Sequence, residues 1–181
     1  MTDASIQTDE IQNLHAPIEN LVFSGGGLKG IAYTGCIQAL EEFDILKDIK
    51  RVSATSVGSL FSFGMLLGYT SSQIKELVFK VDLTFLKDIN ADNLLNFPVN
   101  FGIDSGDKIE KILAILIKKK GYLPEINFQQ FYEVTKIDFI VVGSCVNKQI
   151  PCYFNYKTWP KLSVLKAIRI GCGFPFLYNA V

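Results

Sequence analysis

Histidine is almost absent from this sequence. The chain has 181 residues and a single histidine, His15. His15 precedes the first apolar stretch and lies in residues 1–18, which we expect to form a flexible N-terminal tail. A nucleophilic serine is usually activated by a histidine that a carboxylate orients. Such a triad is nearly excluded within this chain, so a nucleophilic serine here would depend on a carboxylate as its base.

Long apolar runs and export signals are also missing. The two longest apolar stretches, residues 60–68 and 112–117, fall well short of the roughly 20 residues that span a bilayer. The N-terminus is polar and acidic and has no apolar core, so it is not a signal peptide. We therefore expect a cytoplasmic protein whose contact with a membrane is at most peripheral and transient.

Neither the cysteines nor the charges indicate a metal or nucleic acid. The four cysteines form no C-x-x-C pair, and with one histidine a zinc site is not expected. We expect four free thiols, as is usual in a reducing compartment. Lys+Arg and Asp+Glu both number 18. A nucleic-acid-binding protein needs a basic excess for its phosphate contacts, so we expect no nucleic-acid partner.

The composition, 49% hydrophobic and 20% charged, predicts one globular domain over residues 19–181. Short apolar runs, expected to be strands, alternate with segments of helical periodicity. The expected strands are 20–24, 51–55, 137–146 and 151–156. The expected helices are one that starts at Leu28, and then 57–67, 70–80, 107–119, 128–135 and 164–170. This alternation predicts an α/β fold with a mostly parallel sheet.

The periodicity of the first expected helix also predicts which of its faces is buried. The apolar residues on that face are Ala32, Cys36, Ala39, Leu40 and Phe43.

A glycine-rich turn follows the first expected strand and opens the first helix. It consists of Gly25, Gly26, Gly27, Leu28, Lys29 and Gly30. Without Cβ atoms, the backbone can approach a substrate closely and turn its N–H groups toward an oxyanion, at a helix N-terminus that favours negative charge. Lys29 could steer an anionic headgroup or could be a solvated side chain.

Two other interpretations of these glycines compete with an oxyanion site. They match the dinucleotide-binding pattern G-x-G-x-x-G, which needs an acidic residue about 20 positions on, at the end of the second strand. Asp48 lies before that strand, and Ser56 stands where the acid should be. The glycines could also form a tight strand–helix connection that binds nothing.

A serine turn follows the second expected strand and opens the second helix. It consists of Ala54, Thr55, Ser56, Val57 and Gly58. Small residues two positions before and after the serine suit a strained elbow that exposes a nucleophile. An ordinary N-cap serine is the alternative. The glycine turn favours the elbow, because together the two turns would form the two halves of an acyl-transfer site.

The base for this serine is not evident from the sequence. None of the acids after Ser56 sits in a glycine-supported turn at the end of a clear strand. These acids include Glu76, Asp82, Asp88, Asp92, Asp104, Asp107, Glu110, Glu125, Glu133 and Asp138. If the base is internal, Asp104 and Asp138 are the first candidates.

From about residue 20 to residue 181 the chain resembles the patatin-like phospholipases. The glycine turn matches the family's Gly-Gly-Gly-x-Lys/Arg-Gly motif, and residues 54–58 match its Gly-x-Ser-x-Gly elbow. Segments 102–113, 136–143 and 165–175 also look like later family landmarks. The resemblance implies a three-layer α/β/α fold and a Ser–Asp dyad that cleaves acyl esters of lipids or phospholipids without cofactor or metal. It makes Ser56 the nucleophile and places Gly25, Gly26 and Gly27 in the oxyanion hole.

The sequence departs from the family pattern at two points. Ala54 replaces the first glycine of the elbow, a small change that we expect to be tolerated. The dyad aspartate belongs to an Asp-Gly-Gly/Ala motif shortly after the Phe-Pro region; Phe174-Pro175 is present, but the sequence ends at Val181 without that motif. We therefore expect a domain that lacks its C-terminal part and, alone, is nearly inactive. The alternative is a non-catalytic module that binds lipid or protein.

Overall fold

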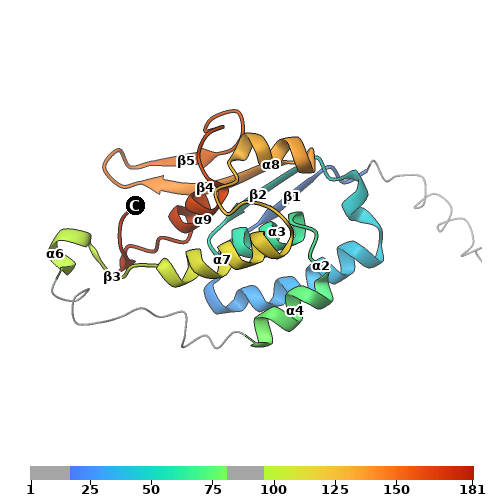
Figure 1. The fold of residues 1–181 in the computed structure, drawn as a ribbon, viewed down its shortest axis with the longest axis horizontal. Helices are drawn as coiled ribbons and strands as arrows, with labels where there is room; N and C mark the ends of the chain where they lie inside the picture. The colour runs from blue at the N-terminus through green and yellow to red at the C-terminus, as the bar shows by residue number, and fades with distance from the viewer. Residues whose placement is uncertain (1–16, 81–95) are drawn as a thin grey trace, which may run out of the picture.

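The structure, a computed structural model, describes residues 17–80 and 96–181. Its centre is a four-stranded sheet of order β1-β2-β4-β5 (Figure 1). The strands are β1 (Asn20–Phe23), β2 (Arg51–Thr55), β4 (Asp138–Cys145) and β5 (Ile150–Phe154). β1, β2 and β4 are parallel, and β5 runs antiparallel to β4. The prediction of an α/β fold with a mostly parallel sheet is confirmed, and the carboxyl ends of β1, β2 and β4 meet at one edge.

Helices connect the strands, close to the expected ranges. The α-helices are α2 (Tyr33–Glu42), α3 (Val57–Leu66), α4 (Ser71–Lys80), α6 (Phe97–Asn100), α7 (Asp107–Lys119), α8 (Phe128–Thr135) and α9 (Val164–Gly171), and two 3-10 helices are η1 (Gly27–Ala32) and η2 (Ile45–Asp48). Residues 1–16, most of the expected tail, and residues 81–95 lie outside the described part of the chain.

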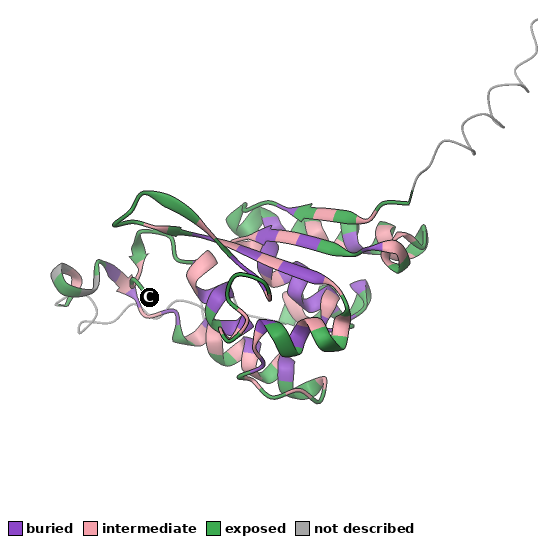
Figure 2. Cartoon of the chain, turned by 90° about the horizontal axis from the view of Figure 1, so that it is seen from above, coloured by how far each residue is buried: buried purple, intermediate pink, exposed green. Residues whose placement is uncertain are grey.

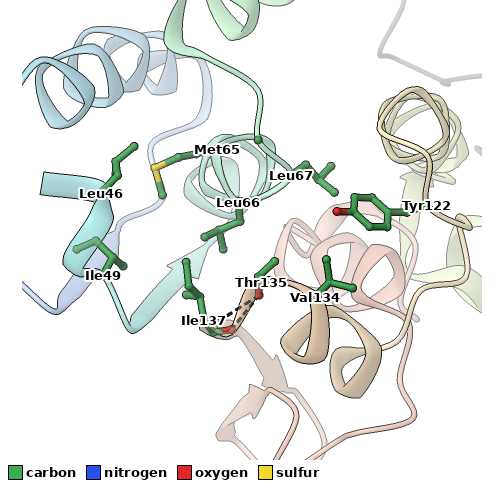
Figure 3. Close-up of a pocket in the computed structure, with 10 residues that line it drawn as sticks. Leu46, Ile49, Met65, Leu66, Leu67, Tyr122, Val134, Thr135 and Ile137 are labelled. Carbon is green, nitrogen blue, oxygen red and sulfur yellow. Dashed lines mark hydrogen bonds between the residues drawn. The ribbon is translucent and has the colours of Figure 1, made fainter. Parts of the chain in front are cut away.

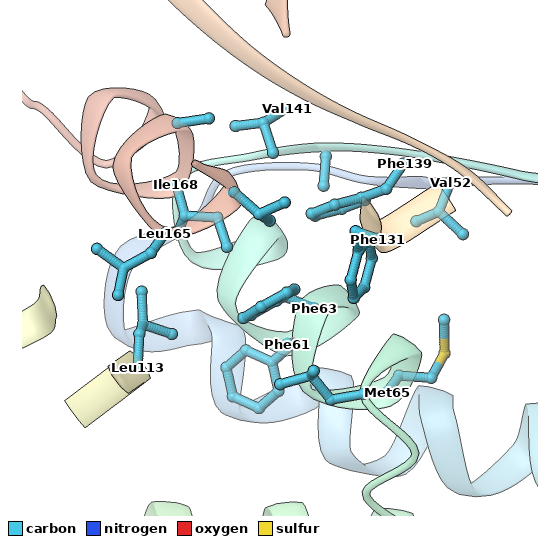
Figure 4. Close-up of a cluster of buried hydrophobic side chains, with 14 of the residues drawn as sticks. Val52, Phe61, Phe63, Met65, Leu113, Phe131, Phe139, Val141, Leu165 and Ile168 are labelled. Carbon is cyan, nitrogen blue, oxygen red and sulfur yellow. The ribbon is translucent and has the colours of Figure 1, made fainter. Parts of the chain in front are cut away.

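The core lies between the sheet and the helices packed on one of its faces (Figure 2). Phe139 of β4 stacks on Phe63 of α3, with 6.0 Å between ring centroids, and it also contacts Phe131 of α8 (Figure 4). On the opposite face, Val22 is 80% exposed and Tyr153 is also exposed. Within the described residues, therefore, the sheet and one helix layer of the expected α/β/α fold are present.

A second, two-stranded sheet lies beyond the carboxyl ends of the central strands (Figure 1). β3 (Gly102–Asp104) pairs in parallel with β6 (Phe176–Tyr178). The strands approach so closely that a Cβ on Gly102 would lie 2.3 Å from backbone atoms of Tyr178 and Asn179. Neither strand was among the elements expected from the sequence, and neither was α6.

Most of the residues predicted to lie on the buried face of the first helix are exposed, so that prediction is largely wrong. Ile37 is fully buried, whereas Cys36 is exposed and Phe43 is 75% exposed. Tyr33, Ile37 and Leu40 also have helical spacing, so α2 carries two overlapping apolar stripes, and the one centred on Ile37 is buried. Leu40, one of the predicted residues, packs against the core, and so does Tyr33, which was not predicted.

Candidate active site

Ser56 sits on a sharp turn between β2 and α3. Its φ is 49° and its ψ is −134°, a conformation that costs a non-glycine residue on the order of 1 to 3 kcal/mol. The Ser56 side chain makes no capping hydrogen bond. Instead, the backbone carbonyl of Ser56 accepts two hydrogen bonds from Ser59, one from its backbone N–H (2.9 Å) and one from its side-chain hydroxyl (2.5 Å). A capping serine has an extended backbone and bonds the helix with its own oxygen. The geometry therefore favours a nucleophile elbow over an N-cap.

The glycine turn lies directly against this serine. A Cβ built on Gly25 would be 3.3 Å from the Cβ of Ser56 and 3.9 Å from its Oγ. Gly25 thus lies beside Ser56 with little room for a side chain between them, although 31 positions separate the two residues in the sequence. The structure brings together the two motifs that the sequence analysis singled out.

Two further glycines hold the turn and the elbow in place. A Cβ on Gly58 would lie 2.5 Å from the carbonyl oxygen of Phe23 and 2.6 Å from that of Ser24. A Cβ on Gly30 would lie 2.4 Å from Cγ2 of Val57. Only glycine allows the first turn of α3 to cross the end of β1 at this distance. Ala54, by contrast, is buried on the inner face of β2, where its methyl group fits.

The space beside Gly26 and Gly27 is open. A Cβ on Gly27 would meet no atom within 4 Å, and one on Gly26 would approach only Cβ of Lys29, at 3.8 Å. Gly27 also has a left-handed φ of 54°, which glycine adopts without strain. Leu28 and Lys29 are exposed. Backbone conformation therefore requires glycine at position 27, and packing requires it at neither position, so the turn is open to a substrate.

The end of α9 forms another side of the site, which the analysis of motifs did not assign. A Cβ on Gly171 would lie 3.9 Å from the backbone nitrogen of Ser56. The thiol of the next residue, Cys172, is buried and hydrogen-bonded to Ser59, and burial raises its pKa to about 11. Such a thiol is almost fully protonated at neutral pH and is a poor nucleophile. The glycines on either side of Cys172 were the sequence signal for this close approach of the end of α9 to the backbone of Ser56.

Asp138 is in the wrong place to be the base, which corrects the expectation from the sequence. It is the first residue of β4 and pairs in register with Arg51, at the amino end of β2. It contacts Arg51 at 3.3 Å and Lys157 at 3.8 Å. Thr55, which precedes Ser56, pairs four residues further along β4, a distance of about 13 Å along the strand.

Asp104 is buried at the end of β3, and its carboxylate accepts a 2.8 Å hydrogen bond from the backbone N–H of Gly106. The other described acids have partners of their own, lie in a helix or are exposed in a turn. Glu110 pairs with Lys166, Glu76 with Lys80, and Glu133 with Gln129, while Asp107 occupies the first turn of α7 and Glu125 is exposed. Asp82, Asp88 and Asp92 lie outside the described residues. Within residues 17–80 and 96–181, no side chain hydrogen-bonds to Oγ of Ser56.

An apolar pocket of about 340 Å³ lies away from the serine (Figure 3). It is lined by Leu46, Ile49, Met65, Leu66, Leu67, Gly68, Tyr122, Val134, Thr135 and Ile137. Ser56 precedes the first turn of α3, whereas the pocket surrounds its last turn. A ten-residue helix is about 15 Å long, so this pocket is separate from the serine site.

The described residues offer no clear place for a cofactor. Among them, no three His, Cys, Asp or Glu side chains are grouped so that they could hold a metal ion. Asp48 lies in η2, before β2 rather than at its carboxyl end, so the acid that a dinucleotide site requires is not at the sheet edge. The four cysteines are free. A search of the described helices finds none with the length and hydropathy of a membrane span.

The family model described as patatin-like phospholipase matches residues 21–181. This chain belongs to the patatin-like phospholipase family. The resemblance seen in its motifs is confirmed, and the match covers the central sheet, both turns and the second sheet.

Individual relatives agree with this assignment. The chain is 30% identical over 164 residues to the uncharacterized protein R571 of Acanthamoeba polyphaga mimivirus, covering 88% of this chain and 53% of the relative. It is 28% identical over 169 residues to triacylglycerol lipase 3 of Saccharomyces cerevisiae, covering 84% and 25%. The chain thus spans about half of the first relative and a quarter of the lipase.

Among solved structures, the fold is similar to that of ExoU from Pseudomonas aeruginosa, determined in complex with SpcU. The TM-score is 0.68 at 23% sequence identity, and the match covers 89% of this chain and 39% of that one. At this identity the similarity supports the patatin-like fold alone.

Proposed function

We propose that this protein is a lipid acyl hydrolase in which Ser56 is the nucleophile. The observation that carries the proposal is the close approach of Gly25 to a serine held at a φ of 49°. An exposed, strained serine beside an open glycine backbone is the arrangement that acyl transfer requires. Membership in the patatin-like phospholipase family and similarity to a triacylglycerol lipase support a lipid ester as the substrate.

The proposed reaction has two steps. Oγ of Ser56 attacks the acyl carbonyl while a base removes its proton, and the backbone N–H groups of Gly26 and Gly27, with that of Gly25, stabilise the oxyanion. One such donor contributes about 3 kcal/mol in other enzymes. The tetrahedral intermediate collapses, the base returns the proton to the departing alcohol, and an acyl-serine remains. A water molecule, deprotonated by the same base, then releases the fatty acid.

We propose that the base is the aspartate of the family's Asp-Gly-Gly/Ala motif, carried on polypeptide outside these 181 residues. Two observations support this assignment: Asp138 lies at the opposite edge of the sheet, and this chain spans about half of R571. Residues 1–181 alone should therefore hydrolyse lipid esters very slowly. Full activity from residues 1–181 would contradict the assignment and would make Asp104 the first alternative.

A fluorophosphonate probe tests the nucleophile in the full-length natural protein. Labelling should map to Ser56 and disappear in Ser56→Ala, while Ser144→Ala, which alters an exposed serine on β4, should label normally. Labelling that persists in Ser56→Ala would identify a different nucleophile. A complete lack of labelling in the unmodified protein would favour a non-catalytic lipid- or protein-binding module.

A further inference from the structure

The glycine turn beside Ser56 needs something outside itself to hold its backbone. Glycine has no side chain that restricts its conformation, whereas the N–H donors of an oxyanion hole have to be in place before the reaction. The space beside Gly26 and Gly27 is open, so packing does not hold them. A backbone bond of 3.1 Å from the N–H of Lys29 to the carbonyl of Gly26 closes the later part of the turn. The earlier part, at Ser24 and Gly25, requires a separate support.

The phenol of Tyr33 supplies that support. Tyr33 is the first residue of α2, and its hydroxyl donates a hydrogen bond of 2.9 Å to the backbone carbonyl of Ser24. The Ser24 hydroxyl lies 3.0 Å from the same phenol oxygen. A phenol has one proton, and the carbonyl accepts it, so the serine hydroxyl donates to the tyrosine. In the part of the chain that the structure describes, no other side chain hydrogen-bonds to the backbone of residues 24–27.

The aromatic ring of Tyr33 is anchored in the core. It packs against Phe23 of β1, with 5.0 Å between ring centroids, and against Phe61 of α3, with 5.8 Å. β1 leads into the glycine turn, and α3 follows Ser56. The phenol is therefore mounted on the two elements that carry the two halves of the site.

The bond to the Ser24 carbonyl also sets the direction of the next N–H group. The carbonyl of Ser24 and the N–H of Gly25 belong to one planar trans peptide, so they point in opposite directions. The carbonyl oxygen faces α2 and α3, because it accepts the bond from Tyr33 and lies 2.6 Å from the position of a Cβ on Gly58. The Gly25 N–H therefore points away from these two helices.

We propose that Tyr33 is a positioning residue, which orients the N–H of Gly25 as an oxyanion donor. This role rests on the proposed function, in which Gly25 is one of the three donors. Tyr33 acts through the Ser24–Gly25 peptide and does not touch the substrate. Ser24 is exposed, so water would replace the phenol at its carbonyl if the hydroxyl were removed. Water has no fixed mount in the core and would leave the peptide free to turn.

Tyr33→Phe removes the hydroxyl and keeps the ring that packs on Phe23 and Phe61. In the full-length natural protein, kcat for a nitrophenyl ester should fall about tenfold, less than the roughly 10²–10³-fold lost with a whole oxyanion donor. KM should change less than about twofold, because such a donor acts mainly in the transition state. A kcat that falls less than about twofold, or a raised KM with unchanged kcat, would overturn the proposal.

Tyr69→Phe is a control of the same kind. The Tyr69 hydroxyl also donates a 2.9 Å bond to a backbone carbonyl, that of Leu116, but Tyr69 lies beyond the opposite end of α3 from Ser56. Each variant loses one bond between a phenol and a carbonyl, so both should lower the melting temperature by a similar few degrees. Only Tyr33→Phe should lower kcat. An equal loss of kcat in both variants would make Tyr33 a structural residue.

The state of the Ser24–Gly25 peptide can be measured without catalysis. Labelling with ¹³C-carbonyl serine and ¹⁵N-glycine selects Ser–Gly peptides in an NMR spectrum, and this sequence contains Ser24–Gly25 and Ser105–Gly106. Ser24→Ala removes the label from the first peptide and so assigns its signal. Tyr33→Phe should shift the amide resonance of Gly25, because a hydrogen bond to the carbonyl polarises the whole peptide. The resonance of Gly106 should stay in place.

A Ser56→Ala background separates this role from the proposed function. The shift of the Gly25 resonance on Tyr33→Phe should be the same in that background, although the protein cannot hydrolyse esters. A shift in a protein whose unmodified form shows no esterase activity would refute the hydrolase and confirm that Tyr33 sets the Gly25 peptide. An unchanged resonance in an active enzyme would overturn the role of Tyr33 and leave the hydrolase standing.

Discussion

The two ends of the central sheet are built in different ways. At the carboxyl end, Gly30 and Gly58 leave no room for a Cβ, and Ser56 is held in a strained conformation. At the amino end, Asp138 pairs with Arg51 and Lys157. In open sheets with parallel strands, ligands bind outside the carboxyl ends. The carboxyl edge therefore combines a strained backbone with close backbone approaches and exposes a serine. The amino edge is stabilised by ordinary ion pairs and apolar packing.

If the carboxyl end of the sheet is the catalytic site, replacing Ser56 should strongly lower the rate of ester hydrolysis and barely change the stability of the fold. Ser56→Ala should lower ester hydrolysis by the full-length protein at least about a thousandfold, as loss of a nucleophile does in serine hydrolases. The free energy of unfolding should change by less than about 1 kcal/mol, because the serine side chain makes no capping hydrogen bond to the described part of the chain. Steady-state kinetics and urea titration measure the two quantities. A large loss of stability would instead make Ser56 a structural residue.

The glycines at this end should be the most costly to replace. Gly58→Ala should destabilise the protein by about 3 kcal/mol or more, because the new methyl group would lie 2.5 Å from a backbone oxygen that cannot move aside. Gly35→Ala is the matched control: nothing lies within 4 Å of that position in α2. There the change should stabilise by about 0.5 to 1 kcal/mol, from helix propensity. Equal effects of the two substitutions on the urea midpoint would refute the close crossing of α3 over β1.

The buried thiol at the carboxyl end should make stability depend on alkaline pH. The pKa of Cys172 rises from 9.0 to about 11 on burial. An unfolded chain therefore releases this proton at lower pH than the folded chain does, so the stabilisation present below pH 9 is lost as the pH rises toward 11. The loss is roughly 2 to 3 kcal/mol.

The difference in unfolding free energy between the unmodified protein and Cys172→Ala isolates this contribution from that of other groups that titrate in this range. A difference that stays constant from pH 8 to pH 11 would mean that the thiol is accessible. Alkylation offers a second measurement, in which exposed Cys36 should react far faster than Cys172.

Local patterns were sufficient to predict the two turns and most of the elements. A strand that stops at three glycines, and a strand that stops at a serine flanked by small residues, each carry their signal within a few positions. The inner face of α2 was mispredicted because the sequence offers two overlapping apolar stripes with helical spacing, and the pattern alone does not say which of them is buried. β3 and β6 were missed because each has three residues and their pairing joins Gly102 to Phe176. A pairing of that range leaves no local pattern.

The sequence held part of the information that places Asp138. The residue that enters a strand and the residue that leaves the neighbouring parallel strand lie at opposite edges of the sheet. Asp138 is the first residue of β4 and Ser56 follows the last residue of β2, so the two cannot be partners if those strands are parallel neighbours. The adjacency of β2 and β4, with 82 residues between them in the sequence, was the information that required the structure.

The smallest effect should come from the amino end of the sheet. Asp138→Asn keeps the shape of the side chain and removes its pairing with Arg51 and Lys157, both of which are half-exposed and can turn to water. Ion pairs with such partners contribute on the order of 1 kcal/mol or less, so the loss of stability should be of that size. Ester hydrolysis should stay within about twofold of the unmodified rate, because about 13 Å of strand separates Asp138 from the level of Thr55. A hundredfold loss of hydrolysis with unchanged stability would make Asp138 the base and would end the distinction between a catalytic and a structural edge.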